Sequence, residues 1–528
     1  MANKSKFQAI KGTRDLLPPE TALWNQVEQT AREVFATFHF GEIRSPIFEP
    51  TELFARAVGG DTDIVGKEMY TFNDRHENLV PRTVGETGEY LTRVKALFER
   101  GEIPKTPFNE LAIQEAQAIW EKSLQPMLAA TSSIEDVYSK PVSDSFTRLF
   151  VFMDAMELGP SISLRPEATA SVCRAYIENS MQQLPQPVKF YYIGPMFRRE
   201  RPQKGRYRQF YQIGAEVLGG QDAPAIDAEV IEMLMTFFDK LNLKGLNLDI
   251  NSIGHNAPNC RPAYVERLRE ELGRVAHRLG PDSVRRVNTN PLRVLDSKVE
   301  SEQAVIETLP RIADHLCDEC KSHYAAVKTQ LQLRGIFYRE NWRLVRGLDY
   351  YMRTTFEITA KGLGSQNAVC GGGRYDGLVE LLGGPPTKGI GFAIGEDRLI
   401  LSLQEQAREA AAQATAQSDP QNAVTANQSP LIAKQPPLIF IAWMGQNTYA
   451  TAVRAAKDLR TAGFPVEVPP NELKFGKALG QADKVGAQFA LILGENEITE
   501  NMWTLKNLTD GTQIKLPEPA LITHLRTL

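Results

Sequence analysis

The chain has 528 residues, a length that predicts three or four domains of roughly 150 residues and excludes a single small binding module. Apolar residues make up 42% of the sequence and charged residues 23%, globular values that exclude a disordered, collagen-like or coiled-coil chain. The formal net charge of −4 excludes a histone-like, sequence-blind nucleic-acid binder, so any contact with nucleic acid must come from a local basic patch.

The sequence shows neither a signal peptide nor a membrane span. No apolar run approaches the roughly 18 residues that cross a bilayer, so we expect no membrane attachment. The five cysteines are too few and too irregularly spaced for a disulfide framework. A reducing cytoplasm is therefore the expected location.

Residues 1–75 predict a helix followed by extended segments. Leu23 to Phe38 has the apolar spacing of a helix with one buried face, and the stretch EIRSPIFEP that follows alternates like a strand. Because Pro46 inside this stretch cannot donate to a ladder, we expect an edge strand or a strand that pairs with another chain. Residues 76–160 predict helical pieces and show no candidate chemistry.

Beyond residue 160, the composition and the predicted elements differ from one segment to the next. Residues 161–255 contain strands and helices rich in arginine, glycine and aromatic residues, 256–334 are mostly helical, and 335–404 combine strands with glycines. Residues 405–436 are rich in Ala, Gln and Ser and predict a frayed helix that continues into a flexible linker. Strands that alternate with helices over 437–528 predict a small α/β domain.

A basic hairpin carries the most informative local signal. Two predicted strands, Phe190–Phe197 and Gln209–Leu218, flank a loop that holds many basic residues and one acid. Side chains alternate along a strand, so Gln212, Gly214 and Glu216 share one face, and Gly214 leaves a hollow between side chains roughly 13 Å apart. A small zwitterion would fit there. The competing interpretation is a solvated hairpin tip on an ordinary exposed sheet.

Two further segments supply what a nucleotide site needs. LRPEATA puts Arg165, Glu167 and Thr169 on alternate positions, and RLVRGLDYYMRTTFE places Arg346 beside a glycine and a pair of tyrosines. CGGGRYDGL and GIGFAIGEDRL supply glycines that let a ligand approach the backbone, with Arg398 near a helix start. The glycine spacing is one residue too long for a dinucleotide fingerprint, and no P-loop motif occurs.

Together these motifs resemble those of histidyl-tRNA synthetases, which are class II aminoacyl-tRNA synthetases. The hairpin resembles motif 2, GIGFAIGEDRL resembles motif 3, and EIRSPIFEPTELF resembles motif 1, whose proline would be Pro46. Further matches are KGTRDLLP, DIVGKEMYTF, NSIGH, NPLRVLDSK, LVRGLDYY and GGGRYDGL. The resemblance covers nearly the whole chain except residues 76–160 and the linker.

The resemblance implies an α+β fold with an antiparallel class II synthetase core flanked by helices. That core would comprise residues 1–75, 161–255 and 335–404. The resemblance also implies a helical insertion domain over 256–334, an α/β anticodon-binding domain over 437–528, and a homodimer formed through motif 1. Residues 76–160 depart from the compact family pattern, and we expect this extra inserted segment to be a surface helical appendage.

The implied activity is that of a ligase in translation. A histidyl-tRNA synthetase activates L-histidine with ATP and Mg²⁺ to histidyl-adenylate and pyrophosphate, and then transfers histidine to the 3′-hydroxyl of the terminal adenosine of tRNA(His). Neither half-reaction requires a side-chain nucleophile, because charge stabilisation by fixed cations is the main need. The implied partners are ATP, L-histidine, tRNA(His) and a second copy of the chain.

The resemblance also implies roles for individual residues. Three would hold the α-ammonium of histidine, namely Glu167, Thr169 and Gln212. The imidazole would be recognised by Glu216 and Tyr351, with Tyr375 lining the same pocket. A carboxylate and a phenol suit the ring N–H groups, and such a site rejects analogues that lack them.

The implied nucleotide-binding residues are four arginines. Arg198 and Arg346 would bind the α-phosphate and the substrate carboxylate and are the implied catalytic residues. Arg206 and Arg398 would bind the β- and γ-phosphates and the adenine face. In the motif 2 loop, Arg201 and Gln203 are the implied contacts of the acceptor end of tRNA.

Two functions of other classes compete with this interpretation. The non-catalytic regulatory subunit of ATP phosphoribosyltransferase resembles the same core, but typically lacks the C-terminal domain and an intact LVRGLDYY, and both are present here. A stress-sensing domain that binds tRNA without charging it would adjoin a kinase, whose signatures are missing from this sequence. Glu216, Arg346 and Tyr351 favour histidine over other class II substrates.

A C-x-x-C-x-x-H run raises the question of a metal site. Cys317, Cys320 and His323 offer three soft ligands, whereas a structural zinc usually needs four, and no second cluster at matching spacing is evident. On a helix the two cysteines would simply share one face. We therefore favour a metal-free helix, with zinc as the alternative that a metal assay would decide. We expect His255 of NSIGH to be a structural turn residue rather than a catalytic base.

Overall fold

The computed structural model describes residues 7–60, 62, 64–73, 86–101, 103, 105–130, 139–155, 160–360, 367–417, 436–445 and 447–527. The chain divides into two compact units, Met1–Leu431 and Ile432–Leu528, and each is considered by itself. Parts of two predicted segments, 76–85 of the insertion and 418–435 of the linker, lie outside the described residues. Among the described helices, none combines the length and apolarity that a bilayer crossing requires.

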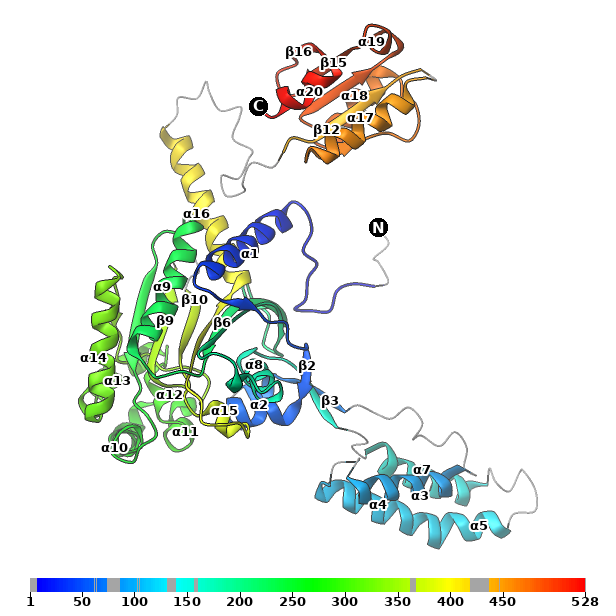
Figure 1. The fold of residues 1–528 in the computed structure, drawn as a ribbon. Coiled ribbons are helices and arrows are strands. Elements are labelled where there is room, and N and C mark those ends of the chain that lie inside the picture. The colour runs from blue at the N-terminus through cyan, green and yellow to red at the C-terminus, as the bar shows by residue number, and fades with distance from the viewer. Residues whose placement is uncertain are drawn as a thin grey trace. The chain divides into compact units, whose positions relative to one another are not determined.

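An eight-stranded sheet forms the centre of the first unit (Figure 1). Its spatial order is β1 (Gly41–Glu42), β5 (Val188–Phe197), β6 (Gln209–Leu218), β11 (Gly389–Gly395), β10 (Ala368–Arg374), β9 (Met352–Thr359), β7 (Asn247–Ser252) and β8 (Arg339–Glu340). The two outermost pairs are parallel and all inner pairs are antiparallel. The predicted antiparallel core is therefore confirmed.

Helices α1 (Glu20–Thr37) and α9 (Pro224–Lys240) supply the aromatic core against this sheet. The ring of Phe35 on α1 lies 5.7 Å from that of Phe237 on α9 and 5.9 Å from that of Phe392 on β11. All three side chains are buried. Since neighbouring residues of a strand point to opposite faces, the residues next to Phe392 point to the other face.

The stretch EIRSPIFEP does not form the single strand that its alternation predicts. It divides into β1 and into β2 (Phe48–Pro50), an edge strand of a separate sheet with β4 (Ser161–Leu164) and β3 (Tyr70–Asn73). Between them, Nη1 of Arg165 donates to the backbone oxygen and to Oγ of Ser45, both at 3.0 Å. A guanidinium thus occupies the backbone acceptor of Ser45, which a continuous strand ladder would use.

Helices make up most of the remainder of the first unit. Helix α2 (Thr51–Val58) packs against the three-stranded sheet, and α8 (Thr169–Glu178) and α15 (Leu378–Leu381) pack against α2. Helix α16 (Glu396–Gln417) packs against the eight-stranded sheet, so the predicted linker begins as helix. The helical insertion contains α10 (Arg261–Val275), α11 (Pro281–Thr289), α12 (Leu292–Leu295), α13 (Glu300–Ile306) and α14 (Asp318–Leu333). The extra segment contains α3 (Thr87–Arg100), α4 (Pro107–Ile119), α5 (Gln125–Ala130) and α7 (Lys140–Ala155), which enclose a core of their own.

The second unit is a five-stranded α/β domain, as predicted. Its strand order is β13 (Val466–Glu467), β12 (Ile439–Trp443), β14 (Phe489–Leu493), β15 (Met502–Asn507) and β16 (Gln513–Pro517), with the first three parallel. Its helices are α17 (Tyr449–Thr461), α18 (Phe475–Lys484), α19 (Glu495–Thr499) and α20 (Glu518–Leu525). Two apolar clusters, one containing Ile441 and one containing Phe440, lie on opposite faces of β12.

A buried ion network joins α9 to the end of β10. Arg374 is 1% exposed and donates to Asp227 on α9, and its Nη1 also donates to Asp376 at 2.9 Å. Because a buried charge without its partner is costly, each carboxylate is needed once the guanidinium is buried.

We expect Asp227→Ala to lower the free energy of unfolding by about 3 to 5 kcal/mol, since it leaves Arg374 incompletely compensated. Glu232→Ala is the matched control on the same helix, because Glu232 pairs with Arg334 while 40% exposed. That control should cost less than about 1 kcal/mol. Urea unfolding of the full chain, followed by circular dichroism, measures both. Equal shifts would contradict the importance assigned to the buried network.

Candidate functional site

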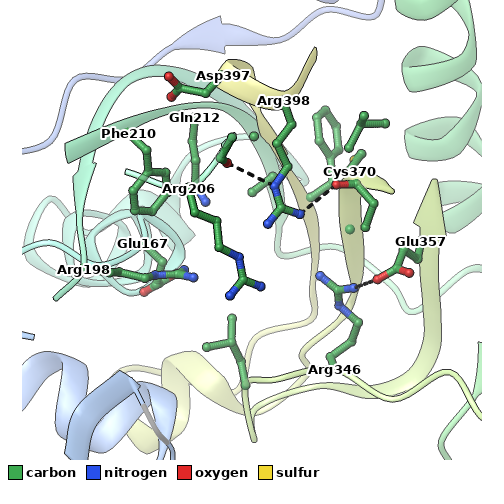
Figure 2. Close-up of a pocket in the computed structure, with 18 of the residues that line it drawn as sticks. Glu167, Arg198, Arg206, Phe210, Gln212, Arg346, Glu357, Cys370, Asp397 and Arg398 are labelled. Carbon is green, nitrogen blue, oxygen red and sulfur yellow. Dashed lines mark hydrogen bonds and ion pairs between the residues drawn. The ribbon is translucent and has the colours of Figure 1, made fainter. Parts of the chain in front are cut away.

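A cavity of about 510 Å³ opens beside the hairpin of β5 and β6. Its lining includes all four arginines that the sequence implicates in nucleotide binding, namely Arg198, Arg206, Arg346 and Arg398. Figure 2 shows their guanidinium groups directed toward a common space. Arg198 and Arg206 belong to the same hairpin loop, whereas Arg346 and Arg398 come from distant segments that the fold brings to it.

Backbone carbonyls hold two of these arginines. Nε of Arg198 donates to the carbonyl of Pro166 at 2.9 Å, and Nη1 of Arg398 donates to the carbonyl of Ala368 at 3.0 Å. Burial lowers the pKa of the Arg398 guanidinium, and the positive charge of Arg206 lowers it further. Cations that destabilise one another in this way favour a polyanionic ligand between them.

Carboxylates hold the other two arginines. Nη1 of Arg206 lies 3.0 Å from Oε2 of Glu200, and Nη1 of Arg346 donates to Oε2 of Glu357 at 2.9 Å. Within the described part of the chain, Nε of Arg346 is buried without a hydrogen-bond partner.

Glycine makes room for Arg346 on the sheet. Gly371 on β10 is opposite Glu357 on β9 in the strand register, and a Cβ at Gly371 would collide with the guanidinium of Arg346. The side chain therefore lies across a bare stretch of backbone, beside the carboxylate that fixes it. Any residue larger than glycine would displace the arginine.

The polar end of the cavity begins at the first turn of α8. The Glu167 carboxylate accepts the backbone N–H of Thr169 at 2.7 Å and that of Ala170 at 3.0 Å. Burial raises the pKa of Glu167, although these donors act in the opposite direction. Oε1 of Gln212 lines the same end, and among the described residues it has no donor although it is buried. An ammonium group would satisfy that oxygen.

Glu216 and Tyr375 lie directly behind the lining rather than in it. The Glu216 carboxyl accepts the hydroxyl of Thr169 at 2.7 Å and that of Tyr375 at 2.6 Å. Burial raises the pKa of Glu216 to about 8. Tyr351 does line the cavity, and burial raises its pKa to about 12. These raised pKa values favour the uncharged forms of Glu216 and Tyr351 at neutral pH.

The hollow expected over Gly214 is not empty. Tyr192 on β5 is opposite Gly214 in the register, and a Cβ at Gly214 would collide with the ring of Tyr192. The expectation of an open hollow between Gln212 and Glu216 is therefore wrong, because a large aromatic side chain from the neighbouring strand covers the glycine. Gln212 keeps access to the cavity and Glu216 does not.

Two predicted residues lie outside the cavity. Arg201 and Gln203 are exposed in the loop between β5 and β6 and do not belong to its lining. The backbone of Gln203 exchanges two hydrogen bonds with that of Arg206, at 3.1 and 2.9 Å. The loop tip thus faces solvent while Arg206 reaches inward.

Sequence reasoning assigned no role to Asp397, which lines the cavity. Its Oδ2 accepts the backbone N–H of Tyr211 at 3.0 Å, and its Oδ1 accepts Nη2 of Arg14 at 3.1 Å. The guanidinium of Arg14 lies 4.7 Å from the ring centre of Tyr207. The motifs KGTRDLLP and GIGFAIGEDRL contain Arg14 and Asp397. The opposite charges of these two residues were the sequence feature that could have indicated their pairing.

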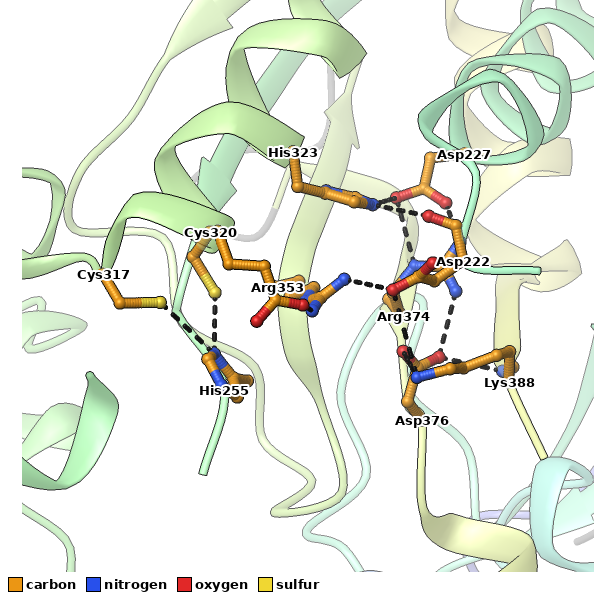
Figure 3. A network of polar contacts seen from close by, with 12 residues as sticks. Asp222, Asp227, His255, Cys317, Cys320, His323, Arg353, Arg374, Asp376 and Lys388 are labelled. Atoms are coloured by element: carbon orange, nitrogen blue, oxygen red, sulfur yellow. Dashed lines mark hydrogen bonds and ion pairs between the residues drawn. The ribbon is translucent and has the colours of Figure 1, made fainter. Parts of the chain in front are cut away.

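The cysteine run behaves differently from its expected pattern (Figure 3). Nε2 of His323 lies 3.2 Å from the carbonyl oxygen of Asp222, on the side of α14 away from the cysteines. Nδ1 of His255 instead lies 2.9 Å from Sγ of Cys320 and 3.7 Å from Sγ of Cys317. Grouping His323 with the cysteines is therefore wrong, and the imidazole beside them is that of His255.

The chain matches two family models. The model of histidyl-tRNA synthetase matches residues 127–399, and the model of the anticodon-binding domain matches residues 438–528. A histidine–tRNA ligase of Koribacter versatilis is 43% identical, with 98% of this chain and 96% of the relative covered. One of Solibacter usitatus is 42% identical, with 98% and 99% covered. The crystal structure of apo histidyl-tRNA synthetase of S. aureus is similar with a TM-score of 0.65 and 31% identity, covering 98% of this chain and all of that one.

The raised pKa of Glu216 leads to a test of stability against pH. The folded state keeps this proton up to about pH 8, whereas the unfolded chain releases it near the ordinary value of 4.5. Stability from this group is therefore complete below about pH 4.5 and is lost as the pH rises through 8. The free energy of unfolding of the parent protein should therefore fall as the pH rises. We expect Glu216→Gln to reduce this fall by a few kcal/mol, since one pKa unit corresponds to about 1.4 kcal/mol.

Urea unfolding midpoints between pH 5 and 9 measure this effect. Glu178→Gln on the same helix as Thr169 is the control, because its side chain is 65% exposed. The control should follow the parent protein across the whole range. A Glu216→Gln curve parallel to that of the parent would show that the carboxyl is already ionised at neutral pH.

Proposed function

The chain belongs to the histidyl-tRNA synthetase family, and from this membership we propose that its cavity activates L-histidine with ATP and then charges tRNA(His). The fold is that of a class II aminoacyl-tRNA ligase. The observation that carries the proposal is the convergence of four guanidinium groups beside a buried, polar end of one cavity. A triphosphate suits the first part of this site and a small zwitterion the second.

The arginines divide the nucleotide between them. Arg198 and Arg346 bind the α-phosphate and the histidine carboxylate, so that the two reacting groups are held together. Arg206 and Arg398 bind the β- and γ-phosphates and the adenine face. Their mutual repulsion in the ligand-free state supports this division, because the triphosphate removes it.

The polar end holds the amino acid. Glu167, Thr169 and Gln212 bind the α-ammonium, and the unpartnered oxygen of Gln212 supports this role. Tyr351 contacts the imidazole, while Glu216 and Tyr375 determine the polarity of the wall behind Thr169. A buried wall of this kind discriminates against side chains that leave its polar groups unpaired.

The histidine carboxylate attacks the α-phosphorus of ATP, and the bond to the leaving pyrophosphate breaks. The 3′-hydroxyl of the terminal adenosine of tRNA(His) then attacks the adenylate carbonyl and releases AMP. Mg²⁺ would enter with the ATP phosphates and would offset part of their negative charge. Glu200 and Glu357 line the cavity and are the carboxylates suited to complete its coordination.

The macromolecular contacts are assigned to other parts of the chain. Arg201 and Gln203, exposed at the hairpin tip, contact the acceptor end of tRNA, and the C-terminal α/β unit binds the anticodon. The enzyme works as a homodimer in the cytoplasm. Ile47 and Phe48, which follow Pro46 and are 44% and 53% exposed, support an interface at the edge strand β2.

The regulatory-subunit alternative is less supported. The chain retains LVRGLDYY, which contributes Arg346 and Tyr351 to the cavity, and it retains the C-terminal domain. A silent subunit would need neither the converging arginines nor an anticodon-binding unit.

Amino-acid-dependent exchange of pyrophosphate into ATP tests the proposed activity. With the full chain, Mg²⁺ and each amino acid in turn, we expect exchange with histidine only. Exchange should be absent without an amino acid. Exchange with a different amino acid would refute the assigned specificity, and no exchange at all would favour the regulatory function.

We expect Arg346→Ala to reduce histidine-dependent exchange by about 10²- to 10³-fold, because it removes a charge that stabilises the transition state. Circular dichroism checks that the variant is folded. Arg201→Ala is the control within the basic hairpin, since its side chain lies outside the cavity. It should retain exchange while tRNA charging falls. Near-normal exchange by Arg346→Ala would refute the role of this arginine.

A further inference from the structure

Four soft ligand atoms meet where the helical insertion joins the sheet. They belong to His255, Cys260, Cys317 and Cys320, and all lie within 4.8 Å of one another. Figure 3 shows Cys317 and Cys320 pointing at the His255 ring. We propose that these four residues bind a structural zinc ion.

The local backbone brings the four side chains together. Cys317 is the N-cap of α14 and Cys320 lies in its first turn, so their sulfur atoms share one face at the helix start. Cys260 is the N-cap of α10. Before it, Gly254 has φ of +65°, and a Cβ there would lie only 2.9 Å from Sγ of Cys260. The turn thus leaves room for that sulfur to point inward.

The geometry is close to that of a tetrahedral site. Zinc–sulfur and zinc–nitrogen bonds of about 2.3 and 2.1 Å place neighbouring ligand atoms about 3.6 to 3.8 Å apart. Nδ1 of His255 is 2.9 and 3.7 Å from the two sulfur atoms of α14, so small side-chain rotations would centre an ion. Three sulfurs and one imidazole are a complete structural set, which excludes the hard cations that need oxygen ligands.

The surroundings favour a negatively charged metal complex. Zinc with three thiolates and a neutral imidazole carries one net negative charge. Two helix N-termini, those of α10 and α14, meet there and favour thiolates. Arg261 follows Cys260 directly, so a guanidinium group lies next to one of the ligands. The positive charge of Arg353 likewise lies within reach of Cys320.

The ion would also stabilise one wall of the cavity. Nη1 of Arg261 donates to the carbonyl of Tyr351 at 2.5 Å, so the start of α10 is tied to a residue of the lining. Fixing Cys260 fixes this arginine. The proposed zinc is therefore a structural device, separate from the reacting groups.

Metal analysis of the full chain, purified without chelators and under reducing conditions, tests the proposal. We expect about one zinc per chain. Cys260→Ser and Cys317→Ser should each lower zinc occupancy by more than about tenfold, because loss of a ligand costs more than loss of an outer-shell partner. His323→Gln is the matched control, since His323 faces Asp222, and it should keep its zinc.

A second measurement uses the parent protein alone, so its result does not depend on whether the variants fold. Replacement of zinc by Co²⁺ in the parent protein should give the intense visible absorption of tetrahedral cobalt with thiolate ligands, and zinc should bleach it. The proposal would be overturned if the parent protein contained no zinc as purified and also bound none after anaerobic reconstitution. Recovery of these cysteines as a disulfide would overturn it as well, as would loss of metal from His323→Gln with retention by Cys260→Ser.

Discussion

Repulsion between like charges is the constraint on which the site depends. Four guanidinium groups share one cavity, where a reduced dielectric strengthens their interaction. The fold opposes this by giving each an acceptor: the carbonyls of Pro166 and Ala368 and the carboxylates of Glu200 and Glu357. The cations are thus fixed before a polyanion arrives. Since little reorganisation remains, most of their attraction is available to the reaction.

The glycines of the sheet follow from this constraint. From the sequence, glycines in β10 and β11 predict close approach of a ligand to the backbone. The structure shows that the protein's own polar side chains take much of this space, because Arg346 lies over Gly371 and the Glu216 carboxylate over Gly391. Large polar groups can be buried on a sheet face only if the neighbouring strand offers bare backbone.

Local sequence patterns predicted the elements whose structure depends on neighbouring residues alone. The hairpin strands were expected at Phe190–Phe197 and Gln209–Leu218, and β5 and β6 differ only by two residues at one end. Alternation and a polar loop suffice for such elements. The split of EIRSPIFEP could not be predicted in this way, because the hydrogen bonds that divide it come from Arg165, far along the chain. The filling of the space over Gly214 likewise depends on the register with β5.

The cysteine cluster likewise depends on a contact between residues far apart in the sequence, which local patterns do not predict. Helical spacing suggested His323 as the third ligand, whereas the ring beside the cysteines belongs to His255, which precedes the whole insertion. The insertion leaves the sheet near His255, and the start of its last helix, α14, returns to the same place. Closing so long a loop costs conformational entropy, and a cross-link at its base reduces that cost. Because Arg261 donates to the Tyr351 carbonyl, and Arg353 pairs with Ile253 and Gly254 through the backbone, order at the base is coupled to the cavity wall.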